Sequence, residues 1–243
     1  MKIISLNTWM GIVPKPLLQF FKTYQDTDIF CLQEIYKGAI SKAEPHPQFT
    51  IQLDLFEQIH AQIGVTHLGY FRPAYKDYYG QAIFIKKGRE VIEEGDIVIF
   101  DNAGNKIRGT HGRNLHYLRT RHHGAPLLIA NVHGLWNGQG KTDTEERLLQ
   151  SQQIHDFLCR KQEPTILVGD FNLEPNTKSL AIVEDGMRNL VKEYGITSTR
   201  TSYYKKDCKF ADYALVTPTI RVRDFRVLPD EVSDHAALFL EIE

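Results

Sequence analysis

Residues 165–172 read Thr-Ile-Leu-Val-Gly-Asp-Phe-Asn, a short apolar run that ends in polar side chains. The run 165–168 has the length and the residue types of a buried strand. A carboxylate and an amide that directly follow a strand are held in place by its backbone, so Asp170 and Asn172 are candidates for a site at a sheet edge. Taken alone, the two side chains could equally form a local turn beside Gly169.

The same pattern recurs elsewhere in the chain. Asn7 follows the apolar run 3–6, Glu34 follows 28–32, and His133 follows 127–132; Asp212 comes after Phe210-Ala211, and the pair Asp234-His235 comes just before the last apolar run. Each residue has a local explanation of its own, such as a turn cap or a surface charge. Their joint occurrence at strand ends predicts that several distant segments meet in one cleft.

The remaining organisation favours a mixed α/β sandwich. Strand-length apolar runs also occur at 82–85, 97–100, 213–216, 221–227 and 237–242, whereas helical spacing occurs around 17–24, after Asp54 and after Thr144. Strands therefore outnumber helices, which argues against a regular alternation of strand and helix. The chain contains no repeat, low-complexity tract or linker, and we expect a single domain over 1–243.

Composition excludes several classes of protein. The 243 residues are 42% hydrophobic and 24% charged, with a net charge of -1, which is too apolar for disorder and too neutral for a global attraction to DNA or an anionic membrane. Cys31, Cys159 and Cys208 have neither disulfide-framework nor zinc spacing, which favours a reducing compartment. Without a signal-peptide pattern or a spanning apolar run, we expect a cytoplasmic protein with no stable membrane association. The sequence indicates no protein partner.

One local stretch is strongly basic. Residues 106–123 contain five Lys or Arg and four His but no acid. They fit either a solvated hairpin face or a surface for a phosphate-bearing substrate, for which Arg113, Arg119 and Arg121 are the candidate contacts.

The oxygen-bearing residues indicate the kind of metal. Glu34 and Asn7 offer hard oxygen ligands, which suit Mg²⁺ or Mn²⁺ when a few waters complete the shell. Zinc is disfavoured because it prefers His and Cys ligand sets.

Taken in order, the motifs resemble those of the endonuclease/exonuclease/phosphatase superfamily, which includes DNase I-like nucleases, inositol polyphosphate phosphatases and sphingomyelinases. The resemblance spans residues 3–242. The matching segments are Ser5-Leu6-Asn7-Thr8-Trp9, Cys31-Leu32-Gln33-Glu34, Gly80-Gln81-Ala82-Ile83-Phe84, Asn131-Val132-His133, Gly169-Asp170-Phe171-Asn172, Ala211-Asp212-Tyr213 and Ser233-Asp234-His235.

The resemblance implies a four-layer α/β sandwich of two mixed β-sheets flanked by helices, and it implies roles for the motif residues. Glu34, helped by Asn7 and Asp234, would hold the metal against a phosphoryl oxygen. Asp170 would activate the attacking water, and Asn172 would position it. His133 and His235 would donate hydrogen bonds to the scissile phosphate, with Asp212 orienting His235.

The chain departs from the DNA-repair nucleases in one motif. Trp9 stands where those enzymes usually have a metal-binding Asp, so the first motif looks more like that of sphingomyelinases and general phosphodiesterases. Trp9 fits either core packing or an aromatic wall for the substrate. In the variable loop that follows His133, Trp136 and Lys141 are the substrate-binding candidates. Arg147 and Gln150 resemble a pair that braces the site.

These observations predict a metal-dependent phosphoric ester hydrolase that acts by in-line attack of water. A phosphodiesterase with a nuclease-like substrate, nucleic acid among the candidates, ranks first because the basic stretch and tyrosine-rich loops offer an extended surface. The alternatives are a phosphomonoesterase, a sphingomyelinase-like lipid phosphodiesterase and, from another class, a non-catalytic phosphate-binding module.

Overall fold

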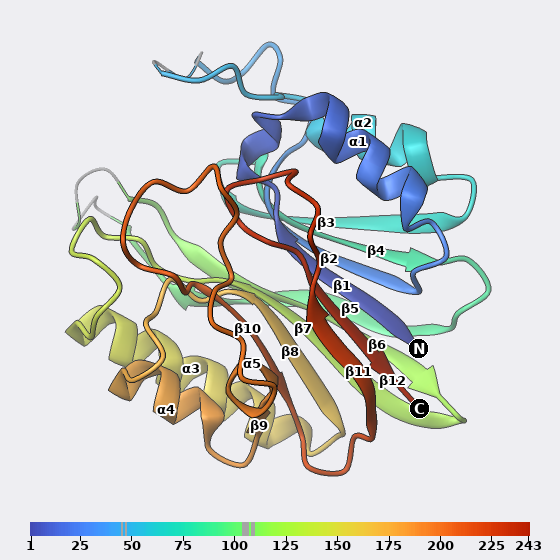
Figure 1. Cartoon of the computed structure of the whole chain (residues 1–243), viewed down its shortest axis with the longest axis vertical. Coiled ribbons are helices and arrows are strands. Elements are labelled where there is room, and N and C mark those ends of the chain that lie inside the picture. The colour runs from blue at the N-terminus through green and yellow to red at the C-terminus, as the bar shows by residue number, and fades with distance from the viewer. Residues whose placement is uncertain (45, 47, 104–106, 108–109) are drawn as a thin grey trace.

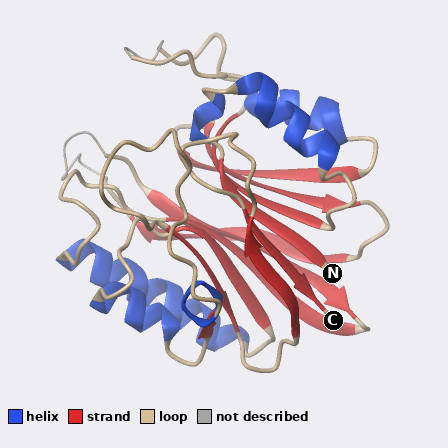
Figure 2. Ribbon diagram, viewed as in Figure 1, coloured by secondary structure: helices blue, strands red, loops and turns tan. Residues whose placement is uncertain are grey.

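Two six-stranded mixed β-sheets pack face to face, with helices on both outer faces (Figure 1). This computed structural model describes residues 1–44, 46, 48–103, 107 and 110–243. Helices α1 (Pro14–Thr23) and α2 (Leu55–Ile63) cover the first sheet, and α3 (Glu145–Lys161) and α4 (Lys178–Glu184) cover the second (Figure 2). The expected four-layer α/β sandwich is confirmed.

The strand order of each sheet follows from the pairing. The first sheet runs β11 (Val222–Val227), β12 (Leu238–Ile242), β1 (Lys2–Asn7), β2 (Ile29–Tyr36), β4 (Tyr79–Lys86) and β3 (His67–Tyr75). The second runs β5 (Val91–Phe100), β6 (Arg113–His122), β7 (Ala125–His133), β8 (Thr165–Asp170), β10 (Asp212–Val216) and β9 (Arg188–Asn189). The short helices η1 (Trp9–Gly11) and α5 (Leu190–Glu193) lie in connecting segments.

The central strands are apolar on both faces because both faces are covered. On β1, Ile3 belongs to the core between the sheets, whereas Ile4 and Leu6 pack under α1 and α2. On β2, Ile29 likewise belongs to the core between the sheets, and Phe30 packs under the helices. Burial on both sides explains why these strands read as continuous apolar runs instead of alternating ones.

The expected helices form where their start signals predict. Thr144 precedes α3, and its hydroxyl accepts a hydrogen bond from the Arg147 amide. Glu145 and Glu146 fill the first turn and Arg160 and Lys161 the last, which complements the helix dipole. No described helix is long and apolar enough to cross a bilayer.

Two parallel pairs determine where the site forms. β1 runs parallel to β2, and β7 runs parallel to β8, with His133 opposite Asp170. β10 runs antiparallel to β8 and begins with Asp212 opposite Asp170. The carboxyl ends of β1, β2, β7 and β8 and the start of β10 therefore lie at one edge of the sandwich.

The structure adds features that the sequence patterns did not predict. β3 was missed because it is an edge strand that contains Gly69 and Pro73, both of which weaken the strand pattern. β2 continues to Tyr36 instead of ending before Glu34, because its pairing with β4 shifts register between Leu32 and Ile35. Of the basic stretch, Lys106 and Arg108 lie outside the described residues.

Candidate active site

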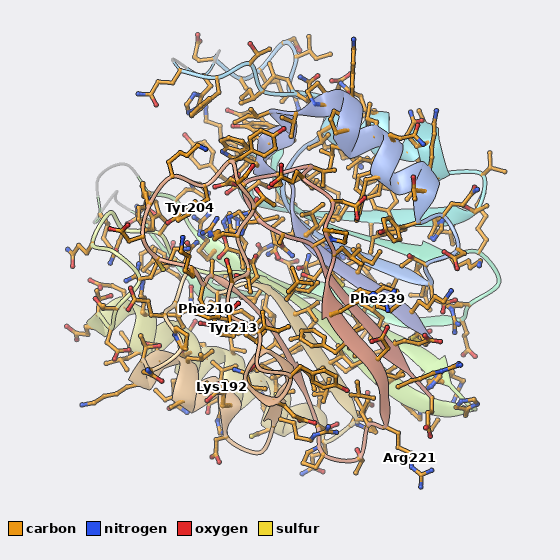
Figure 3. All side chains as sticks on the ribbon, in the orientation of Figure 1. Lys192, Tyr204, Phe210, Tyr213, Arg221 and Phe239 are labelled. Atoms are coloured by element: carbon orange, nitrogen blue, oxygen red, sulfur yellow. The ribbon has the colours of Figure 1, made fainter. Side chains whose placement is uncertain are left out.

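A cavity of about 430 Å³ opens at this edge and gathers most of the predicted site residues. Asn7 and Asp212 are hydrogen-bonded to residues that line it. Tyr204, which also lines it, lies on the loop that leads to Phe210 and Tyr213 at the start of β10 (Figure 3). The predicted residues on its wall are Glu34, Arg113, His133, Trp136, Lys141, Asp170, Asn172, Asp234 and His235.

Asp170 is the most constrained carboxylate of the cavity. Its Oδ1 accepts the Asn172 amide hydrogen at 2.8 Å, and its Oδ2 accepts from Asn7 Nδ2 at 3.0 Å. Burial alone would raise its pKa, but the surrounding positive charges, that of His235 foremost, outweigh burial and hold the pKa below its usual value. Asp170 is therefore an anion that keeps one side toward the cavity.

Gly169 allows β8 to deliver Asp170. Its φ of +138° is outside the range of ordinary side chains, and a Cβ there would lie 2.1 Å from the Val132 carbonyl oxygen. Only glycine permits this close approach of β7 and β8 directly below the site.

Glu34 projects into the cavity from the irregular segment of β2. Its φ is 59°, and the Thr8 hydroxyl donates to its carbonyl oxygen at 3.2 Å. The carboxylate accepts from Asn7 Nδ2 at 3.0 Å, and burial raises its pKa. Asn7 thus clamps Glu34 and Asp170 together.

His235 and Asp212 form a buried pair. His235 Nδ1 lies 2.9 Å from both Asp212 oxygens, and the Thr199 hydroxyl donates to Asp212 at 3.1 Å. Burial acts to lower the pKa of His235, but the charge of Asp212 overcomes it and raises the pKa above its ordinary value. The Nε2 atom lies 3.6 Å from Asp170 Oδ2, so this edge of the imidazole ring faces the cavity.

His133 has a different electrostatic environment. Its Nε2 lies 3.7 Å from Glu34 Oε1 and 3.9 Å from Asp170 Oδ2. Burial, aided by the charge of Arg113, lowers its pKa well below the ordinary value. The two histidines of the cleft therefore differ, because Asp212 favours the charged form of His235 whereas burial favours the neutral form of His133.

The donor set fits a hard divalent cation. The Glu34 carboxylate borders the cavity, and Asp234 Oδ1 is buried without a hydrogen-bond partner among the described residues. Asn7 was predicted to help Glu34 hold the metal. In the structure its oxygen accepts the Trp9 amide hydrogen at 2.9 Å while its nitrogen faces the carboxylates, so that Asn7 orients Glu34 and Asp170.

A second group of oxygen and nitrogen ligands lies nearby. Ligand atoms of Asp170, Asp212 and His235 come within 4.8 Å of one another, the one such group in the described part of the chain. Asp212 pairs with His235 through Nδ1 at 2.9 Å, an arrangement that also suits proton transfer.

The three candidate arginines lie at different places along β6. Arg113 begins the strand, lines the cavity and donates to the Gly134 carbonyl at 3.0 Å. Residue 121 is eight positions further on, about 26 Å at the rise of a strand. Arg119 pairs with Glu93 and Glu163, and Arg121 pairs with Glu90. Of the three predicted substrate contacts, Arg113 therefore lines the cavity, whereas Arg119 and Arg121 lie apart from it in ion pairs with glutamates.

The loop after His133 is held by α3. The buried Arg147 guanidinium donates to the carbonyls of Gly140 and Thr142, each at 2.6 Å, and the Gln150 side chain accepts from the Leu135 amide at 2.9 Å. These contacts agree with the expected bracing by the two residues, and they carry Trp136 and Lys141 to the cavity wall.

Several cavity residues were not singled out from the sequence. Arg200 lies on the loop before β10 and pairs with Asp234 at 3.3 Å. His111 is largely buried beside Arg113, and burial lowers its pKa to about 3. Neither belongs to a recognisable motif, so only the folded loops reveal them. Trp9 also lines the cavity, with its ring 5.8 Å from that of Phe49.

Comparison with known proteins identifies the class and then the family. The two-sheet sandwich is the fold of solved structures of DNase I-like proteins. The chain belongs to the Endonuclease/Exonuclease/phosphatase family, whose model matches residues 4–235. A search of curated protein sequences finds no match.

Solved structures share the fold at low identity. A mannosyl-6-phosphatase of Bacteroides thetaiotaomicron is 18% identical with a TM-score of 0.75, and the match covers 100% of this chain and 99% of that one. A humanized Danio rerio TDP2 is 16% identical with a TM-score of 0.70 and coverage of 100% and 98%. The human Nocturnin catalytic domain, with bound sulfate, is 18% identical with a TM-score of 0.68 and coverage of 100% and 93%.

Proposed function

We propose that this protein is a divalent-metal-dependent phosphoesterase that hydrolyses a small phosphoester by direct attack of water. The observation that carries the proposal is the meeting of Glu34, Asp170 and His235, from three remote segments, around one cavity. In the balanced reaction, water adds to phosphorus, the ester P–O bond breaks, and the leaving alcohol departs with a proton.

The roles of the side chains follow from their charges. Asp170 is anionic and accepts the proton of the attacking water, and Asn172 orients that water. Asp212 favours the charged form of His235 and fixes its tautomer, and His235 donates through Nε2 to a phosphoryl or leaving-group oxygen. His133 donates a neutral hydrogen bond to the same phosphate.

Glu34 and Asp234 would hold Mg²⁺ or Mn²⁺, with Asn7 orienting Glu34. When bound, the cation would supply Lewis-acid stabilisation of the charge on the phosphoryl oxygens.

The site favours a compact substrate over a long polynucleotide. Its basic residues lie inside the cavity, whereas Arg119 and Arg121 lie outside it in ion pairs with glutamates. This distribution removes the main reason for ranking an extended nuclease substrate first. A single-stranded phosphodiester end remains the second candidate, because Trp9, Trp136 and Tyr204 on the cavity wall could stack on bases.

The test is hydrolysis of bis-p-nitrophenyl phosphate and p-nitrophenyl phosphate with Mn²⁺ and with EDTA. We expect turnover only with the metal, and a loss of about 10²–10⁴-fold for Asp170→Asn. A melting curve close to wild type establishes that this variant is folded. Turnover in EDTA, or full activity of folded Asp170→Asn, would contradict the proposal.

A further inference from the structure

Arg200 is a buried cation that does not use all of its donors. Its side chain is 5% exposed and lines the cavity. One nitrogen pairs with Asp234 Oδ2 at 3.3 Å, and the guanidinium lies 4.0 Å from the centre of the Tyr204 ring. Its Nε is buried without a hydrogen-bond partner among the described residues. A buried donor of this kind costs stability unless a ligand or a water accepts its hydrogen.

Lys141 presents a second cation beside it. Its ammonium lies 5.8 Å from the same Tyr204 ring and donates to the Phe210 carbonyl at 3.3 Å. In the described chain no carboxylate oxygen lies within 4.0 Å of this nitrogen, although the residue is buried at the cavity wall. Burial lowers the pKa of Lys141, although the charge of Asp170 opposes the shift. An anionic ligand would satisfy both cations.

The cavity has an excess of positive charge before any metal binds. Its lining includes four basic residues, Arg113, Lys141, Arg200 and Lys206, against the three acids Glu34, Asp170 and Asp234. A bound divalent cation would increase the excess. A phosphodiester brings one negative charge, whereas a terminal phosphate brings about two at neutral pH. The charge balance therefore favours a terminal phosphate.

We propose that Arg200, with Lys141 and Tyr204, forms an oxyanion subsite that selects phosphomonoesters over phosphodiesters. This inference rests on the proposed function and names its substrate class. In it, Arg200 contacts the second ionised oxygen of the terminal phosphate, and Tyr204 holds the guanidinium in place. If Arg200 only held Asp234 in place, its loss would instead lower the hydrolysis of both ester types equally.

The experiment compares kcat/KM for p-nitrophenyl phosphate and bis-p-nitrophenyl phosphate at saturating Mn²⁺. We expect Arg200→Met to lower kcat/KM for the monoester by about 50-fold and for the diester by less than about fivefold, since the lost contact is a charge-assisted hydrogen bond. Arg200→Lys keeps a charge and should show a smaller loss with the same selectivity. Arg119→Met is the matched control, because Arg119 is also paired with acids but lies outside the cavity; it should change neither value.

A second measurement separates this inference from the proposed function. Calorimetric titration with inorganic phosphate in EDTA needs no turnover, and Arg200→Met should weaken the affinity by about tenfold or more. If wild type hydrolyses neither ester, the proposed function fails and the phosphate titration alone decides about Arg200. If Arg200→Met fails to fold, the subsite is tested by the selectivity of Arg200→Lys between the two esters. Equal losses on both esters, or unchanged phosphate affinity, would overturn the subsite.

Discussion

Glu34 in β2 and Asn172 just after β8 both have left-handed backbone conformations, with φ of 59° and 54°. Such conformations are uncommon outside glycine and cost free energy, and they persist where the surrounding contacts enforce them. Here the contacts are visible, because Thr8 holds the Glu34 carbonyl and the Gly134 carbonyl accepts from Asn172 Nδ2 at 3.2 Å. The strain turns both side chains toward the cavity.

The protonation of His235 predicts how activity depends on pH. Asp212 holds the pKa of His235 above its ordinary value, and the proposed donor must be protonated, so activity should fall as pH rises through that pKa. Asp212→Asn removes the charge and lowers the pKa. The alkaline limb of the kcat/KM profile should then move to lower pH.

The control for this change is Asp224→Asn, which removes a β11 carboxylate paired with Arg226 and should leave the limb in place. An unmoved limb in folded Asp212→Asn would mean that His235 is not the titrating donor.

Residue identities were predictable from the sequence, but their contacts were not. Asp170, His133 and His235 occur in motifs, so their types and order were sufficient to single them out. Arg200 has no motif, and its place beside Asp234 comes from the isolated bridge between Arg200 and His235. Nor could a sequence reveal that the Asn7 amide faces two carboxylates, because this depends on a side-chain rotation.

Among the elements, α3 acts on the site without touching the reaction centre. Arg147 holds the loop that carries Trp136 and Lys141, through charged hydrogen bonds from its buried guanidinium to the Gly140 and Thr142 carbonyls. Arg147→Lys cannot reach these acceptors together, so the free energy of unfolding should fall by about 3 kcal/mol. KM should rise because the loop loosens.

Urea denaturation measures the first effect and steady-state kinetics the second. Arg160→Lys, at the exposed end of the same helix, is the matched control and should change neither quantity measurably. Wild-type stability in Arg147→Lys would show that the loop does not depend on this residue.

Element boundaries were less predictable than element types. The apolar runs located β1, β7, β8 and β10 because buried central strands need little besides apolar residues. β6 was read only as a basic stretch, since its charges pair across the strands with Glu90 and Glu93. The spread of Arg113, Arg119 and Arg121 along one extended strand therefore escaped the sequence pattern.

In the molecule as a whole, the position of one sheet against the other brings the motif residues together. Gln33 of the first sheet donates to Asn131 of the second at 2.6 Å, and Asn131 donates back to the Leu32 carbonyl at 3.0 Å. All of these groups are buried between the sheets. Such a directional contact fixes a relative position that apolar packing alone leaves adjustable.

A double-mutant cycle tests this connection. Gln33→Leu leaves the Asn131 oxygen buried and unsatisfied, so the free energy of unfolding should fall by about 2 kcal/mol. Asn131→Leu should cost a similar amount. The double variant should lose less than the sum of the two single losses, because the Gln33–Asn131 hydrogen bond is then lost only once and neither side-chain amide is left facing a leucine. Additive losses in urea denaturation would argue against the contact.

The central claim is that distant chain segments build a cation site at Glu34 next to the water-activating Asp170. Anomalous diffraction from crystals grown with Mn²⁺ tests it most directly. We predict a manganese peak at coordination distance, about 2.0–2.3 Å, from a Glu34 carboxylate oxygen. A peak held instead by Asp212 and His235, or one remote from Glu34, would contradict the account.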